Sequence, residues 1–225
     1  MSFRESLPAN QRHAIGRFES FGDVVVGFSM SLLALQLDIP KTPDDVFGHA
    51  SRYLVFFAAF GTVSLFWLRF HRLMSTGFVP HHQDIVLLFA FLAFVALMPY
   101  ALLTYSRLQR STLSSPEALM LYIGVFLGAI GFGWLLTLRG MRRAWTYLDA
   151  VERRQSWRAF VAGGTAIPVL AAALAVLATN GSRGFSVVIV LVFAIPLARR
   201  LWRQPATWVL GVAPGDGTLA AAEVS

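Results

Sequence analysis

The sequence has no cysteine and few charged residues. The absence of cysteine excludes disulfides, thiolate chemistry and cysteine–zinc sites. Only 14% of the 225 residues are charged and 56% are hydrophobic, whereas a soluble domain carries roughly 25% charged and 45–50% apolar residues. The many Phe, Leu, Val and Trp residues also exclude a disordered chain. With a mean hydropathy of +0.60, the composition indicates an integral membrane protein.

The 19 Lys and Arg residues give the chain a net charge of +7, but they do not share one polar face. They stand in short clusters between long apolar runs, a pattern that argues against nucleic-acid binding. When the N-terminus is placed in the cytoplasm, most of these residues fall on the cytoplasmic side. This bias predicts a multi-pass protein of the plasma or inner membrane with both termini in the cytoplasm.

A helix needs about 20 apolar residues to cross the hydrocarbon core of a membrane. We predict an all-α fold with six transmembrane helices at about 17–39, 53–70, 85–105, 117–138, 158–181 and 184–202. Residues 1–204 would form one membrane domain, followed by a loosely ordered tail over residues 205–225. The longest polar link, residues 140–158, is predicted to be an amphipathic helix on the membrane surface, where its basic side chains would touch anionic lipid headgroups.

The first span differs from the others because polar residues interrupt it: Asp23, Ser29, Ser31, Gln36 and Asp38. At about 100° per residue, one arc of roughly 100° collects Gly27, Phe28, Ser31, Leu35 and Asp38, with Asp23 at its edge. A stripe that mixes small, polar and bulky apolar groups suits a tight helix–helix contact or a water-lined path. Periodicity alone leaves both interpretations open.

Asp23 is the ionisable residue of the first span that most needs an explanation. It could stabilise the start of the helix through the helix dipole. It could instead form an ion pair that fixes the packing of the span, with Arg17 or Arg69 as the partner, or it could contact an ion directly.

Three segments resemble a known family. Residues 17–23 (Arg-Phe-Glu-Ser-Phe-Gly-Asp) resemble the Arg-x-x-x-Phe-Ser-Asp signature of the transmembrane protein 175 family, which comprises endolysosomal potassium channels and prokaryotic single-repeat relatives. Residues 67–73 (Trp-Leu-Arg-Phe-His-Arg-Leu) are similar to that family's Trp-x-Asn-His-His-Arg-Leu segment. Residues 87–99 are similar to its Leu/Phe-rich run ending in Pro. The resemblance covers residues 17–100, and the later spans match only in number and hydropathy.

The resemblance implies a homotetrameric potassium channel in which the first helix lines a central pore that has no carbonyl filter loop. By position, Phe28 would form the constriction, Ser31 would contribute to potassium preference, and Leu35 would form a further apolar layer. The pore helix would be braced from outside by the signature residues Arg17, Phe21, Gly22, Asp23, Trp67 and His71. The implied partners are the other subunits, the lipid bilayer and permeant monovalent cations, with K+ as the permeant ion and no cofactor.

Several positions depart from the family pattern. Gly22 replaces a Ser, Arg69 an Asn, Phe70 a His and Ser31 a Thr, and Phe28 is larger than the usual Ile or Leu. Four Phe28 rings could plug the path, so a non-conducting structural relative is one alternative. Another is a proton-coupled secondary transporter that uses Asp23 as its proton site. Trp67 could also serve only as an aromatic anchor at the membrane interface.

An enzyme is not predicted, because the spans hold no nucleophile with a nearby base and the chain has no Gly-rich phosphate loop. A metal cluster could be drawn from neighbouring side chains: His81, His82 and Asp84, together with His71. Adjacent histidines in a loop rarely converge on one ion without a third fixed ligand. We therefore predict a polar helix start at these residues. Gly131 and Gly133, inside the fourth span, are predicted to allow close helix packing.

Overall fold

The computed structural model describes residues 3–35, 37, 50–111 and 116–180. The predicted sixth span and C-terminal tail lie outside the described residues, as do Gln36 and Asp38.

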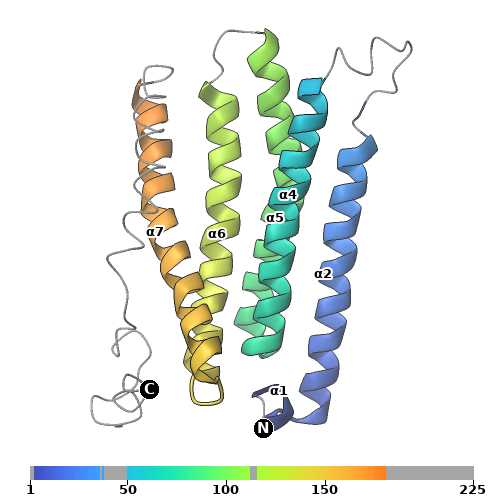
Figure 1. Ribbon diagram of the computed structural model, residues 1–225, viewed down its shortest axis with the longest axis vertical. Helices are drawn as coiled ribbons and strands as arrows, with labels where there is room; N and C mark the ends of the chain where they lie inside the picture. The colour runs from blue at the N-terminus through green and yellow to red at the C-terminus, as the bar shows by residue number, and fades with distance from the viewer. Residues whose placement is uncertain (1–2, 36, 38–49, 112–115, 181–225) are drawn as a thin grey trace.

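The described part of the chain is a bundle of long helices. Its elements are α1 (Phe3–Ser6), α2 (Ala9–Leu35), α4 (Ala50–Thr76), α5 (His82–Ser111), α6 (Pro116–Ala144) and α7 (Ala150–Asn180). Successive long helices run in opposite directions, so α1, the α4–α5 turn and the α6–α7 turn share one end of the bundle (Figure 1). We call this the α1 end. Within the described residues, five helices are long and apolar enough to cross a membrane. The protein is a multi-pass membrane protein.

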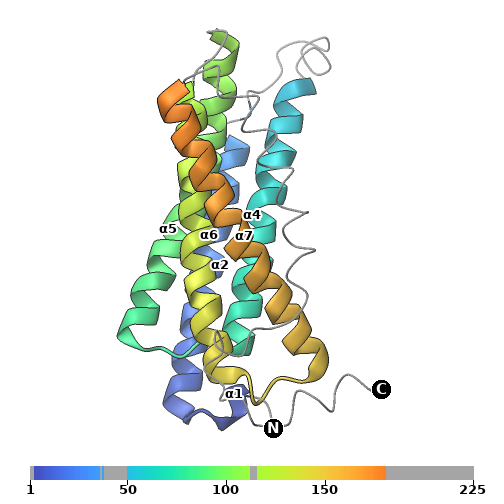
Figure 2. The same ribbon diagram turned by 90° about the vertical axis from the view of Figure 1, so that its left-hand side faces the viewer.

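The helices extend beyond the predicted spans. The prediction of a separate surface helix over residues 140–158 is wrong, because α6 continues to Ala144 and α7 begins at Ala150. At 1.5 Å per residue, helices of this length reach about 45 Å, whereas the hydrocarbon core is about 30 Å thick. The basic residues at these helix ends therefore belong to the parts of α6 and α7 that continue past the apolar core. Figure 2 shows α7 inclined to α6, on which it packs.

The N-terminal region is also more helical than predicted. α2 begins at Ala9, directly after Pro8, whose carbonyl accepts a hydrogen bond from the amide of Arg12 at 3.1 Å. Proline is well tolerated at the start of a helix, because the amide that it lacks would have no partner there. An ion pair of 3.0 Å between Arg4 and Glu19 ties α1 back onto α2.

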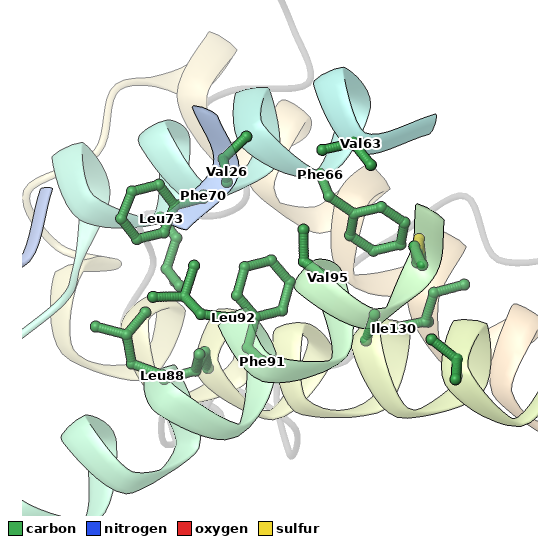
Figure 3. Packing of buried hydrophobic residues seen from close by; sticks show 14 of the residues in the cluster. Val26, Val63, Phe66, Phe70, Leu73, Leu88, Phe91, Leu92, Val95 and Ile130 are labelled. Carbon is green, nitrogen blue, oxygen red and sulfur yellow. The ribbon is translucent and has the colours of Figure 1, made fainter. Parts of the chain in front are cut away.

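The main hydrophobic core lies between α4, α5 and α6 (Figure 3). Phe70 of α4 and Phe91 of α5 are almost fully buried there. Gly133 of α6 lets the Phe91 ring approach, since a Cβ at Gly133 would lie 3.1 Å from that ring. The prediction of close packing is thus met at Gly133, while a Cβ at Gly131 would have nothing within 4 Å.

An ion-paired carboxylate joins α5 to α6 at the α1 end. Asp84, in the first turn of α5, is 1% exposed, and its Oδ1 lies 2.6 Å from Nε of Arg139. Its Oδ2 accepts a short hydrogen bond from Nη1 of Arg143. A charge removed from water needs such partners, because desolvating an ion alone is very costly. Asp84 therefore fixes the start of α5 against the end of α6.

Candidate pore helix and its polar brace

α2 packs on the rest of the bundle with one face only. Its buried residues are Ile15, Gly22, Val26, Ser29 and Leu33, and its neighbours are α4 and α5. At about 100° per residue, these positions point roughly 180° away from the stripe predicted in the sequence. The fold of a single chain thus uses the side of α2 that lies opposite the stripe.

The stripe itself is the face that a single chain leaves free. Val24 is 69%, Phe28 65% and Leu35 80% exposed, and Ser31 is exposed as well. These four residues lie within an arc of about 60° along α2. The structure therefore brings Phe28, Ser31 and Leu35 together on one surface, as the sequence predicted, and no other described helix of the chain covers it.

The hydroxyl of Ser31 is oriented by its own helix. Its Oγ donates to the carbonyl of Gly27 at 2.9 Å. A hydroxyl has one proton and two lone pairs, so this bond uses the proton and leaves the lone pairs as acceptors. Ser29 makes the same bond to Val25 at 2.7 Å, but Ser29 is buried. Of the two serines, Ser31 alone offers oxygen lone pairs on the free face of α2.

A polar contact links α2 to α4 beside this face. Nε1 of Trp67 donates to Oδ1 of Asp23 at 2.8 Å, and Nε2 of His71 lies 2.9 Å from the same oxygen. The Trp67 and His71 rings are edge to face, with centroids 4.5 Å apart. An indole N–H can only donate, and His71 donates when Nε2 carries the proton. The Trp67 indole is thus engaged with α2, beyond any role as an interfacial anchor.

Neither predicted arginine partner of Asp23 pairs with it in the described structure. Arg17 and Asp23 are six positions apart on α2, so their side chains point about 120° apart, whereas helical ion pairs need a spacing of three or four. The side chain of Arg69 points from α4 toward α6 and α7 instead. Its Nη2 lies 3.3 Å from the place that a Cβ would take if Gly163 of α7 carried one. The arginine ion pair, one of the alternatives for Asp23, is thus not formed in the described structure, where Trp67 and His71 contact its carboxylate instead.

Two departures from the family pattern meet in one contact. A Cβ on Gly22 would lie 2.3 Å from Cζ of Phe70, far closer than two non-bonded carbon atoms can approach. Phe70 is buried, and the space over Gly22 is filled by its ring. The sequence shows two separate losses of a polar group, while the structure shows a glycine and an aromatic ring that fit each other.

The remaining signature phenylalanine faces a different neighbour. The Phe21 ring packs edge to face on Phe89 of α5, with centroids 5.4 Å apart, and stands away from the Asp23 contact. His81, directly before α5, and His82, its first residue, are exposed, whereas Asp84 between α5 and α6 is engaged by two arginines. The structure thus supports the prediction of a polar helix start at these residues.

Comparisons with known proteins show which family the first half of the chain resembles. Residues 17–99, which contain the free face of α2 and the residues Asp23, Trp67 and His71, match the sequence model described as endosomal/lysosomal potassium channel TMEM175. Over these residues the chain is similar to the TMEM175 family.

A solved member of the TMEM175 family has a similar fold. It is a single-residue variant of the potassium channel MtTMEM175, crystallised in complex with a nanobody–MBP fusion protein. The two structures align with a TM-score of 0.65 and 17% sequence identity, over 83% of this chain and 90% of that one. No curated protein sequence matches this chain. At this identity the likeness concerns the fold, and the assembly and pore of this chain are matters for proposal.

Proposed function

We propose that this protein is a homotetrameric channel for monovalent cations, favouring K+, in which four copies of α2 line a central pore. The observation that carries the proposal is the free face of α2, which combines bulky apolar side chains with the oxygen of Ser31. An exposed polar group in the middle of a membrane helix is costly against lipid. It is well placed against a water-filled path or an ion.

In this pore, Phe28 and Leu35 form apolar rings on either side of Ser31. An apolar ring can gate a pore by dewetting, and a nearby ring of oxygens can replace part of the hydration shell of an ion. The Ser31 hydroxyl suits this role because its proton is already engaged by Gly27. Four such oxygens would offer acceptor lone pairs to a cation just beyond the Phe28 ring.

The contact of Asp23 with Trp67 and His71 sets the rotation of α2 in this arrangement. It lies about 140° around the helix from Phe28, and it fixes α2 to α4 without entering the pore. If α2 turned by one residue, about 100°, Ser31 would leave the axis. Asp23 thus affects conduction indirectly, because it holds α2 in the rotation that points Phe28, Ser31 and Leu35 toward the pore axis. This role makes a proton-transport function for Asp23 unnecessary.

A flux assay with a matched control tests the pore. Reconstituted protein should carry K+ into liposomes, and Phe28→Ala should raise the flux while weakening discrimination between cations. Phe57→Ala is the control, because Phe57 of α4 is 66% exposed, about the same as Phe28, and lies on another helix. Equal fluxes for wild type and Phe28→Ala in an active preparation would show that Phe28 does not form the constriction.

The size of Phe28 supports a second candidate, a closed relative of the channels. Four phenyl rings at one level could seal the path, and then only Phe28→Ala would conduct. Subunit counting comes first in either case. A fourfold assembly in the membrane supports a shared pore, while a stable monomer contradicts it. The proposal also places the protein in the cell membrane with the N-terminus in the cytoplasm, which an accessibility tag at residue 1 would report.

A further inference from the structure

A cavity outside the proposed pore lies between α4, α6 and α7, at the α1 end of the bundle. Its volume is about 350 Å³, and its walls include Leu65, Arg69, Thr137, Gly140, Ser156 and Ala162. Cavities that bind small molecules in proteins measure ~300–1,000 Å³. The cavity is therefore large enough for a small group such as a phosphate with its substituents.

Arg69 is the feature of the cavity that calls for a ligand. Its Nε and Nη2 atoms are buried, and neither has a hydrogen-bond partner in the described residues. Two glycines on the facing helices leave room for this side chain, since Cβ atoms on Gly133 and Gly163 would lie 3.6 Å from Nε and 3.3 Å from Nη2. Two buried N–H groups without a partner are unfavourable, because they have lost water and gained no hydrogen bond in return.

Two carboxylates of the described helices around α4 have other partners. Asp84, the buried acid of the α1 end, is held by Arg139 and Arg143. Asp23 accepts hydrogen bonds from Trp67 and His71, which lie on the side of α4 opposite to Arg69. A second arginine, Arg72, also lines the cavity. The described lining of the cavity thus contains two arginines and no carboxylate, and an anion from outside the chain would be attracted to it.

We propose that this cavity binds an anionic phosphate group, with the Arg69 guanidinium as its main ligand. A guanidinium donates to phosphate oxygens in a planar, often bidentate arrangement. Leu65 and Leu68 at the cavity are exposed on the outer side of α4, so an acyl chain could lie along them. The apolar wall favours the headgroup of an anionic phospholipid over free phosphate as the source of the group.

The test measures binding to the purified full-length chain by native mass spectrometry and by the shift in melting temperature. The probes are dioctanoyl phosphatidylglycerol, dioctanoyl phosphatidylcholine and inorganic phosphate. The variants are Arg69→Gln, which removes the proposed ligand, and Arg158→Gln, which removes the same charge from an exposed position of α7. Ala162→Leu narrows the cavity and leaves Arg69 in place, so it tests the site even if Arg69→Gln fails to fold.

Phosphatidylglycerol should bind wild type and Arg158→Gln with the same Kd. In Arg69→Gln its Kd should rise at least about tenfold, because the variant loses the charged donor of the proposed hydrogen bonds. Ala162→Leu should also weaken binding, and phosphatidylcholine should bind less well. Arg69-dependent binding of inorganic phosphate with no preference for the lipid would support the site and identify free phosphate as the source. Equal Kd values for Arg69→Gln and Arg158→Gln would overturn the proposal.

Discussion

The contact between Gly22 and Phe70 predicts a strong coupling between α2 and α4. In Gly22→Ala, the new Cβ would stand 2.3 Å from Cζ and 2.5 Å from Cε1 of Phe70, so the buried ring or the helix must move by about 1 Å. Overpacking a core in this way costs ~1–3 kcal/mol. Against this, replacing a helical glycine by alanine gains ~1 kcal/mol through helix propensity.

A double-mutant cycle isolates the contact. Gly16→Ala on the same helix is the control, because a Cβ there has nothing within 4 Å and only the gain in propensity remains. We expect Gly16→Ala to stabilise the protein and Gly22→Ala to destabilise it. With Phe70→Leu as background, Gly22→Ala should lose most of its cost, which gives a coupling energy of about 1–3 kcal/mol, within the range of residues in contact.

The free energy of unfolding is measured in mixed micelles for wild type, for the single variants and for the double variant. If Gly22→Ala were as stable as Gly16→Ala, the close approach of α2 and α4 at this point would be refuted. Additive effects of Gly22→Ala and Phe70→Leu would refute it as well.

Three other variants test separate parts of the structure. Ser31→Ala should move the ratio of K+ to Na+ permeability toward one. Ser29→Ala, which removes a similar but buried hydroxyl, should leave the ratio unchanged. Equal effects of the two variants would contradict the assignment of Ser31 to the pore. Asp84→Asn should lower the free energy of unfolding by ~1.5–3 kcal/mol, since it removes the buried carboxylate that accepts hydrogen bonds from two half-buried arginines. Gln83→Ala, which removes a more exposed hydrogen bond to Arg139, should cost less than ~1 kcal/mol in the same assay. Trp67→Phe should lower stability by ~0.5–1.5 kcal/mol through the loss of its hydrogen bond to α2, and an unchanged stability would contradict that bond.

The stripe on α2 could be predicted because it depends only on local information. Helical periodicity places Phe28, Ser31 and Leu35 on one face in any helix, whatever surrounds it. The opposite face must then carry the contacts with the rest of the chain, as Val26 and Leu33 do. The helix ends were less predictable, since basic residues such as Arg142 and Arg143 mark the edge of the membrane and leave the end of the helix undetermined.

The side-chain partners could not be derived from composition or periodicity. Whether Asp23 meets Arg69 or Trp67 depends on how α4 is rotated, and these residues are only two positions apart on α4. The family resemblance grouped Asp23 with Trp67 and His71, and the structure brings these three together. The fit of Gly22 to Phe70 could not be predicted from either segment alone. The small residue on α2 is explained only by the ring on α4 that packs against it, and the two lie 48 positions apart in the sequence.

The central claim is that the free face of α2 lines a water-filled path in the assembled protein. The absence of cysteine allows a direct test, since a single introduced thiol has no background. Ser31→Cys should react with a charged, water-soluble methanethiosulfonate reagent, and the reaction should block K+ flux in liposomes. Phe57→Cys on α4 should show no block under the same treatment. If Ser31→Cys failed to react, or reacted with no change in flux, α2 would not line the pore.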